Sequence, residues 1–281
     1  PKEDFTQREL AEELGISLGK VNSLLKEMKE AQFLDQEGHL SELGDEVLEP
    51  YRVQNAIIMA AGMSSRFAPL SYEIPKGLLK VKGQRLIERE IEQLQEAGIE
   101  DITVIVGYMQ EKMFYLADKY NVKIVGNNDY YKYNNCSSLM LVRDQLSNTY
   151  ICSSDNYFAE NPFEKYIYRG YYSTIFVEGE TDEYCATEDS NNMIVDIQIG
   201  GKDTWAMVGH VYFDRAFSEK FVKILEKEFK HEPYKEQLWE DYYSRHVYEL
   251  HLEARHYSAD IVKEFDSLDE LRQFDEHYLM N

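Results

Sequence analysis

Hydrophobic residues in the first 50 positions recur at the spacing of α-helices. The pattern predicts one helix that begins after Thr6, with Glu9 three residues later as a capping partner, and ends at Gly15. A second helix is predicted from Ser17, and its apolar face consists of Val21, Leu24, Leu25 and Met28. Two helices joined by a short glycine-containing turn form a helix-turn-helix. The sequence FLDQEGHLSELG, residues 33–44, then predicts a small hairpin and the start of another helix.

From residue 55 the pattern changes to continuous apolar runs that alternate with helical patterns. Strands are predicted at residues 56–60, 101–108, 122–127 and 149–158, and helices at residues 86–99, 111–120 and 137–146. Such alternation with short connections is typical of a mostly parallel sheet with helices on both faces. Four antiparallel strands are expected at residues 172–178, 183–188, 193–201 and 204–214, then helices at 217–229, 233–247 and after residue 266.

These patterns predict two domains. Residues 1–52 are expected to form a winged helix-turn-helix-like module, and this segment resembles the winged-helix modules of bacterial regulators. Residues 53–281 are expected to form an α/β domain with a mixed, mostly parallel, Rossmann-like sheet flanked by helices.

Acidic residues outnumber basic residues strongly. The 281-residue chain has a formal net charge of −22, and residues 1–50 hold thirteen Asp or Glu against five Lys or Arg. Because affinity for DNA comes mostly from neutralised phosphates, an acidic module argues against DNA binding and favours packing or dimerisation. The oligomeric state stays open, with a homodimer as one option.

Several features bear on the cellular context. No apolar run is long enough to cross a bilayer, and no signal peptide opens the chain. Cys136, Cys152 and Cys185 form no CxxC motif, which fits reduced thiols in the cytoplasm. We therefore expect a cytoplasmic protein that does not contact membranes. Because the chain begins at Pro1 rather than Met, we also expect a piece of a longer protein, with a fused domain after Asn281 as one option.

A distinctive loop follows the first buried strand. It supplies small residues, hydroxyls and a guanidinium in turn: Ala60, Ala61, Gly62, Met63, Ser64, Ser65 and Arg66. Small side chains let backbone N–H groups approach an anion closely, and a guanidinium can hold phosphate oxygens in bidentate fashion. Lys76 follows Pro75 and adds a second cation. Since ligands bind beyond the carboxyl ends of parallel strands, the loop is a candidate polyphosphate site, although it has neither GxGxxG nor GxxxxGK[ST].

The loop resembles the signature of the sugar-nucleotide-type nucleotidyltransferases. That signature is close to LAAGxGxRxxP followed by PKxLxxVxGxPLI, and the chain reads MAAGMSSRFAPL at residues 59–70 and PKGLLKVKGQRLI at residues 75–87. Ser64 stands where the signature usually has glycine. This departure leaves the backbone of the loop open but not its phosphate-binding role.

Four further segments are similar to bacterial choline-phosphate cytidylyltransferases. They are VIVGYMQEKMFYL (residues 104–116), NNDYYKYNNCSSLMLV (127–142), TYICSSDNYF (149–158) and VKEFDSLDELRQF (262–274). The resemblance covers about residues 55–276 and does not reach the N-terminal module. It implies transfer of a cytidylyl group from CTP to a small phosphate acceptor, with release of pyrophosphate.

The resemblance implies roles for the matching residues. Arg66 would bind the β- and γ-phosphates of CTP, and Lys76 would stabilise charge on the α-phosphate. Asp155 and Asp266 are the candidate ligands of Mg²⁺, which prefers oxygen donors. The cytosine and ribose would be bordered by Gly107, Tyr108, Asn127, Asn134 and Ser138.

The second half of the chain holds candidates for the acceptor site. A choline head group calls for aromatic rings with a carboxylate nearby, and residues of these kinds are Tyr184, Tyr212, Phe213, Trp239, Glu240 and Asp241. Phosphocholine is therefore the first candidate acceptor. Tyr184 stands where choline enzymes tend to have tryptophan, and the carboxylates Asp182, Glu183 and Asp189 would also suit a primary ammonium. Phosphoethanolamine and 2-aminoethylphosphonate thus stay open.

Two other hypotheses remain at this level. The chain could be a nucleotidyltransferase of the same fold that acts on a sugar phosphate. It could also be a transcriptional regulator whose transferase-like domain only senses a nucleotide, although the acidic module and the intact loop argue against this.

Overall fold

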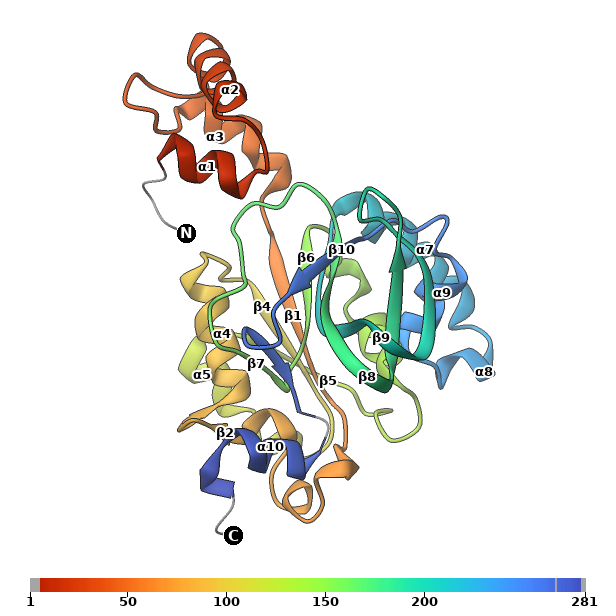
Figure 1. Cartoon of the computed structure of the whole chain (residues 1–281). Coiled ribbons are helices and arrows are strands. Elements are labelled where there is room, and N and C mark those ends of the chain that lie inside the picture. Colours follow the sequence, from red (N-terminus) through yellow and green to blue (C-terminus); the bar gives the residue numbers. More distant parts are fainter. Residues whose placement is uncertain (1–5, 266, 279–281) are drawn as a thin grey trace. The chain divides into compact units, whose positions relative to one another are not determined.

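The computed structural model describes residues 6–265 and 267–278 of the chain. These residues belong to two compact units, Pro1–Arg52 and Val53–Asn281 (Figure 1). Each unit has its own elements and is described by itself.

The N-terminal unit is helical. Its elements are α1 (Gln7–Glu13), α2 (Leu18–Glu30), α3 (Glu42–Leu48) and the 3₁₀ helix η1 (Glu49–Tyr51). The Thr6 hydroxyl accepts a hydrogen bond from the backbone N–H of Glu9, and the Glu9 carboxylate accepts one from the N–H of Thr6, which caps α1 as predicted. Between α2 and α3, Leu34 and Leu40 form an antiparallel bridge. The wing of this winged helix-turn-helix unit is therefore very short.

A seven-stranded sheet organises the second unit. Its central strands are β1 (Asn55–Ala60), β4 (Ile102–Val106), β5 (Lys123–Gly126) and β6 (Thr149–Ser153), and the strand order is β10-β8-β9-β6-β1-β4-β5. β1 pairs in parallel with both β4 and β6, and β4 pairs in parallel with β5. β9 is antiparallel to both β6 and β8, and β10 is parallel to β8. This confirms the mixed, mostly parallel sheet expected from the sequence.

The four antiparallel strands expected after residue 170 are two long strands instead. β8 (Tyr171–Glu188) and β9 (Ile194–Phe213) run continuously and pair with each other, while β10 (Glu253–Tyr257) lies at the sheet edge. Register shifts interrupt the β8–β9 ladder at several points, including the segment between Val177 and Glu180. The shift between Val177 and Glu180 coincides with the gaps that the sequence pattern left at residues 179–182 and 202–203, so each long strand was predicted as two.

Helices cover both faces of the sheet (Figure 1). α4 (Leu86–Glu96) and α5 (Tyr115–Tyr120) pack on one face, where Ile58 of β1 points. α6 (Asn135–Leu141), α7 (Arg215–Glu228) and α9 (Trp239–Arg245) pack on the other face with Ile57. The helix predicted at 233–247 is split into α8 (Glu232–Lys235) and α9, because the Asp241 carboxylate accepts from the Leu238 N–H and starts a new helix.

A smaller core lies beneath the loop that follows β1. It joins Phe67, Leu79, Tyr157, Phe265 and Leu271. The elements around it are β2 (Lys80–Val81), β3 (Gln84–Arg85), β7 (Asn156–Phe158), β11 (Val262–Glu264) and α10 (Leu268–Phe274). The remaining 3₁₀ helices are η2 (Ser65–Phe67), η3 (Leu70–Tyr72), η4 (Lys76–Leu78), η5 (Gln110–Lys112), η6 (Arg143–Gln145) and η7 (Glu276–Tyr278).

The strand predicted at residues 149–158 is divided between two sheets. β6 belongs to the large sheet, whereas β7 pairs with β11 in a separate two-stranded sheet. The chain turns between them at Ser154 and Asp155, and this turn presents Asp155 beside the loop after β1. Asp155, which the sequence pattern placed within a strand, thus lies in a turn next to a cavity.

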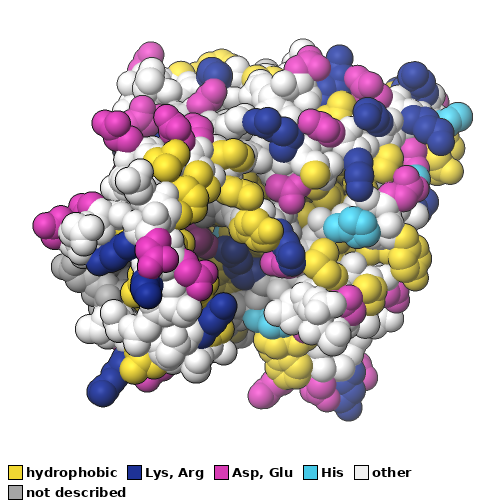
Figure 2. Space-filling view, turned by 90° about the horizontal axis from the view of Figure 1, so that it is seen from above, with side chains coloured by type: hydrophobic (Ala, Val, Ile, Leu, Met, Phe, Trp, Pro, Cys, Tyr) yellow, Lys and Arg dark blue, Asp and Glu magenta, His cyan; other side chains and the backbone are white. Residues whose placement is uncertain are grey.

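The surface carries charges of both signs. On the face drawn in Figure 2, Lys and Arg side chains are interspersed with Asp and Glu side chains. Within the described part of the chain, no helix has the length and apolar character that a membrane crossing requires.

Candidate active site

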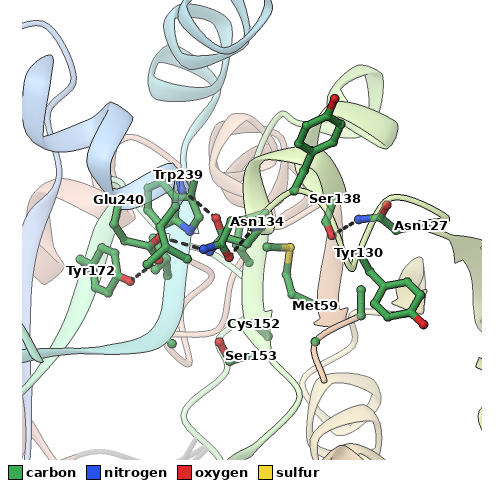
Figure 3. A pocket seen from close by; sticks show the side chains of 18 residues that line it. Met59, Asn127, Tyr130, Asn134, Ser138, Cys152, Ser153, Tyr172, Trp239 and Glu240 are labelled. Carbon is green, nitrogen blue, oxygen red and sulfur yellow. Dashed lines mark hydrogen bonds between the residues drawn. The ribbon is translucent and has the colours of Figure 1, made fainter. Parts of the chain in front are cut away.

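Two adjoining cavities open at the carboxyl ends of β1 and β6. The chain passes from β1 to β4 and β5 and then returns to β6 on the other side of β1, and ligands of open α/β sheets bind at such reversals. Cavity A (Figure 3) is lined by Met59, Ala61, Gly62, Asn127, Tyr130, Tyr133, Asn134, Asn135, Ser138, Ile151, Cys152, Ser153, Tyr172, Gly209, Val211, Leu238, Trp239 and Glu240. Cavity B is lined by Met59, Ala60, Gly62, Ser64, Pro75, Lys76, Gly77, Met113, Ser153, Ser154 and Asp155.

The glycine of the loop after β1 stands where the two cavities meet. Gly62 lines both of them, and a Cβ built on it would meet no atom within 4 Å. Ser64 lines cavity B in the left-handed conformation, with φ 51° and ψ 44°. Glycine adopts this conformation at little cost, which explains why the nucleotidyltransferase signature usually has glycine there. Serine at this position keeps the left-handed backbone.

Gly107 and Tyr108, predicted to border the base, lie behind the loop instead. A Cβ on Gly107 would stand 2.7 Å from the Ala61 carbonyl oxygen and 2.8 Å from Tyr130 Cβ. The backbone N–H of Tyr108 donates to the Ala61 carbonyl (3.1 Å), and its hydroxyl donates to the Ser71 carbonyl (3.0 Å). Both residues hold the loop in place, and neither lines cavity A or B.

Lys76 and Asp155 meet in cavity B. Lys76 Nζ lies 2.6 Å from Asp155 Oδ2, and the lysine side chain is buried. Gly77 permits this approach, because a Cβ there would stand 3.0 Å from three atoms of Ser154. The second carboxylate oxygen, Asp155 Oδ1, is also buried and has no hydrogen-bond partner among the described residues. A buried carboxylate oxygen without a partner is costly unless a ligand satisfies it.

The polar side chains predicted near the base converge on cavity A. Asn127 lies after β5, and its Nδ2 donates to Ser137 Oγ (2.9 Å) and Ser138 Oγ (3.0 Å). Asn134 caps α6 and lines the cavity together with Asn127 and Ser138. Asn127 uses its side chain to hold Ser137 and Ser138, whereas Asn134 is exposed at the start of α6.

A carboxylate lies at the other end of cavity A. Glu240 Oε1 accepts from the Tyr172 hydroxyl (3.1 Å), and Glu240 Oε2 accepts from Asn135 Nδ2 (3.2 Å). The Trp239 backbone N–H donates to Asn135 Oδ1 (2.7 Å). Burial raises the pKa of Glu240 to about 7, because removal from water disfavours the charged carboxylate. Figure 3 shows Tyr172 and Glu240 side by side, far from Tyr130.

Comparisons with known proteins agree with this geometry. Residues 56–162 match the model of the MobA-like NTP transferase domain, and residues 2–62 match a family described as wHTH-PRTase associated. The chain is 33% identical over 221 residues to a choline-phosphate cytidylyltransferase of Streptococcus pneumoniae, covering 79% of this chain and 96% of that one. It is 36% identical over 229 residues to a 2-aminoethylphosphonate cytidylyltransferase of Lancefieldella rimae, covering 80% and 93%.

A solved structure supports the same assignment. The CTP:phosphocholine cytidylyltransferase of Streptococcus pneumoniae superposes with a TM-score of 0.77 and 34% identity, covering 80% of this chain and 99% of that one. The chain belongs to the bacterial cytidylyltransferases. This confirms the family resemblance read from the loop after β1 and the four later segments, and it assigns the chain to an enzyme family.

Four predicted acceptor residues, Tyr184, Tyr212, Phe213 and Asp241, do not line either cavity of this cytidylyltransferase, and Phe213 is fully buried in the core beside Trp239. Tyr212 is fully buried on the opposite face of the sheet, where it packs against Tyr150 and Tyr171. Its neighbour Val211 faces cavity A, because successive side chains of a strand point to opposite faces. The Tyr184 hydroxyl donates to Asp241 Oδ1 (2.8 Å), and these two residues bond to each other outside both cavity linings.

Other predicted residues of the cytidylyltransferase lie at its surface or beyond what is described. Met63, Ser65 and Arg66 are exposed and line neither cavity. Asp266 lies outside the described residues. The role of Arg66 toward the β- and γ-phosphates therefore stays a prediction.

The structure adds residues that the sequence patterns did not single out. Tyr172 and Asn135 hold Glu240 from β8 and α6, two elements whose proximity only the fold reveals. Glu264 of β11 pairs with Asn156, the residue after Asp155, and its Oε2 accepts from the Gly209 N–H (3.3 Å). It is thus a further carboxylate near cavity B.

Glu90 of α4 is another addition. It is 1% exposed, and neither carboxylate oxygen has a hydrogen-bond partner among the described residues. Burial, and then the charge of Asp155, raise the pKa of Glu90 well above its ordinary value. A proton on this carboxyl avoids a second buried negative charge behind Asp155.

Proposed function

We propose that the protein transfers CMP from CTP to a small aminoalkyl phosphate or phosphonate. An oxygen of the acceptor attacks the α-phosphorus of CTP and forms a new P–O–P bond. The bond from the α-phosphorus to its bridging oxygen breaks, and pyrophosphate leaves with the electron pair. The observation that carries this proposal is the convergence of the Gly62 loop, the Lys76–Asp155 pair and the Glu240 carboxylate on two adjoining cavities.

In this proposal, CTP would bind in cavity B and in the adjacent half of cavity A. Gly62 leaves open space between them, so that backbone N–H groups of the loop can approach phosphate oxygens. The buried Lys76 ammonium would stabilise negative charge that develops during attack and departure. Asn134 and Ser138 offer hydrogen-bonding groups for the base and ribose in cavity A.

Asp155 fits the requirements of a magnesium ligand. Its Oδ1 is buried without a hydrogen-bond partner among the described residues, and Mg²⁺ prefers carboxylate oxygens together with phosphates and water. Glu264 lies close by through the pairing of β11 with β7, and Asp266 stays a candidate from the sequence. When bound, the ion would neutralise charge on the phosphates of CTP. Lys76 holds the other oxygen of Asp155 and so fixes the carboxylate in cavity B.

In this proposal, the acceptor would bind beside Glu240. A carboxylate beside a cavity suits an acceptor that carries a positive nitrogen, and two of the relatives are named for such acceptors, phosphocholine and 2-aminoethylphosphonate. The phosphate or phosphonate of the acceptor would then point toward cavity B, where the α-phosphate of CTP is expected.

Pyrophosphate release tests this proposal. The chain is incubated with Mg²⁺, an aminoalkyl phosphate or phosphonate, and each of CTP, UTP, ATP and GTP. We expect release with CTP, and a loss of at least about 100-fold in kcat/KM in Lys76→Met and in Asp155→Asn. The exposed residues Lys112 and Asp118 provide matched controls, and Lys112→Ala and Asp118→Asn should keep full activity. Full turnover by Asp155→Asn, or no release with any nucleotide, would refute the proposal.

A further inference from the structure

Given the proposed function, the residues around Glu240 in cavity A determine whether an acceptor with a primary ammonium or one with a trimethylammonium fits there. A trimethylammonium group is held mainly by open faces of aromatic rings. A primary ammonium instead donates three hydrogen bonds and needs oxygen acceptors. The aromatic and polar groups around Glu240 can therefore be compared with these two demands.

The aromatic rings nearest to Glu240 are already packed. Trp239 is 2% exposed, and four rings lie around its indole at centroid distances of 5.1 Å (Phe213), 5.6 Å (Tyr172), 5.7 Å (Phe221) and 6.2 Å (Tyr243). Tyr172 is 3% exposed and stacks on Trp239 with an interplanar angle of 16°. Neither ring presents an accessible face wide enough for three methyl groups. Both belong to the hydrophobic core on this side of the sheet.

The remaining tyrosines of cavity A do not complete a cage. Tyr133 already has two ammonium groups near its ring, Lys132 Nζ at 4.4 Å and Lys235 Nζ at 5.3 Å from the centroid. A further cation on that ring would be repelled by both. Tyr130 lies beside Gly107 and the Ala61 loop, at the far end of the cavity from Glu240 (Figure 3).

Glu240 itself meets the demands of a primary ammonium. Its two oxygens are oriented by Tyr172 and Asn135, and each carboxylate oxygen can accept a further hydrogen bond. Among the described residues, no lysine, arginine or histidine forms an ion pair with it. Burial raises the pKa of Glu240 to about 7, and an incoming cation would favour the charged carboxylate again.

We propose that cavity A selects an acceptor with a primary ammonium over one with a trimethylammonium, and that Glu240, oriented by Tyr172 and Asn135, binds that ammonium. Aminoethyl phosphates and phosphonates carry such a group. This inference rests on the proposed function, and it reverses the order of acceptors that the aromatic content of the sequence favours.

A panel of acceptors tests the inference with the full chain. Pyrophosphate release from CTP and Mg²⁺ is measured with 2-aminoethylphosphonate, phosphoethanolamine and phosphocholine at a range of concentrations. We expect kcat/KM for at least one primary amine to exceed that for phosphocholine by about 10-fold or more, which corresponds to about 1.4 kcal/mol. Equal or faster turnover of phosphocholine would overturn the inference and leave the proposed function standing. Absence of release with every acceptor would overturn the proposed function itself.

A matched pair of variants tests the role of Glu240. Glu240→Gln keeps the shape of the side chain and removes its charge, so KM for the primary amine should rise about 10-fold or more while KM for CTP stays the same. Glu236→Gln makes the same chemical change at an exposed position and should leave both constants unchanged. An unchanged KM for the amine in Glu240→Gln would overturn the assignment of this residue.

Discussion

Single residues of the loop after β1 determine how much room a ligand has. Gly62 has no neighbour where a Cβ would stand, so its missing side chain leaves space within the cavities. At Gly107 the opposite holds, because a Cβ there would clash with the Ala61 carbonyl oxygen and with Tyr130. The two glycines therefore predict different phenotypes, one in binding and one in folding.

Gly62→Ala should impair nucleotide binding without destabilising the fold. The new methyl group would clash with no protein atom but would occupy the space between the two cavities. We expect KM for CTP to rise about 10-fold, with Tm unchanged. Gly19→Ala in α2 is the control for binding, and it should leave KM for CTP unchanged. A lowered Tm with normal KM for CTP would contradict the interpretation of Gly62.

Glu90→Gln should stabilise the protein at neutral and alkaline pH. The pKa of Glu90 is raised in the folded state, so its contribution to stability is fully present below the ordinary pKa of glutamate and is lost as pH rises toward the folded-state value. Glutamine has no such dependence. At pH 8 we expect a gain of about 1 kcal/mol, or roughly 2–4 °C in Tm, and near pH 4 no gain.

Thermal unfolding at both pH values checks this prediction. Glu111→Gln, at an exposed position on η5, serves as the control and should leave Tm unchanged at either pH. A gain for Glu90→Gln that is larger at pH 4 than at pH 8 would show that the sign of the shift is wrong.

At the scale of elements, the sequence predicts features that depend on neighbouring residues in the chain. It does not predict contacts between residues that are distant in the sequence and meet only in the folded sheet. The loop after β1, the cap of α6 at Asn134 and the parallel strands follow from motifs and hydrophobic runs. Tyr212 was predicted to bind the acceptor, but the alternation of side chains along β9 does not reveal which face of the sheet borders the cavity. In the structure Val211, not Tyr212, faces cavity A. Tyr172 and Asn135 could not be found, because β8 and α6 meet Glu240 only through long-range packing.

Asn135 joins α6 to the start of α9, and its removal should loosen the Glu240 end of cavity A. Asn135→Ala leaves the Trp239 N–H and one oxygen of Glu240 without their partners. We expect a loss of about 1 kcal/mol in unfolding free energy and a several-fold higher KM for the acceptor, with KM for CTP less affected. Calorimetry and steady-state kinetics check both. A changed KM for CTP alone would contradict this link between the two helices.

The whole molecule combines an acidic surface with a site for anionic substrates. A net charge of −22 opposes the approach of CTP, so in the proposed reaction the attraction would come from local groups, namely Lys76, Arg66, the loop N–H groups and the Mg²⁺ ion. Two cytidylyltransferase relatives align over 96% and 93% of their own length with only 79% and 80% of this chain, so about a fifth of the chain has no counterpart in those alignments. Whether the N-terminal unit binds DNA or mediates dimerisation stays a prediction of the sequence.

Removal of residues 1–52 should therefore leave cytidylyl transfer intact. The second unit contains the whole seven-stranded sheet and all residues that line cavities A and B. We expect the chain from Val53 to Asn281 to keep kcat/KM within about 3-fold of the full chain, a difference below 1 kcal/mol. A loss beyond 100-fold in a folded truncation would assign the N-terminal unit a direct part in the reaction.

Phosphorus NMR of the products tests the central claim most directly. The full chain is mixed with CTP, Mg²⁺ and 2-aminoethylphosphonate or a related phosphate, and the spectrum is followed with time. We predict that pyrophosphate and a new P–O–P linkage accumulate in equal amounts, and that chelation of Mg²⁺ or the Asp155→Asn substitution stops both. Release of orthophosphate without the new linkage, or identical spectra for the Asp155→Asn variant, would contradict the account.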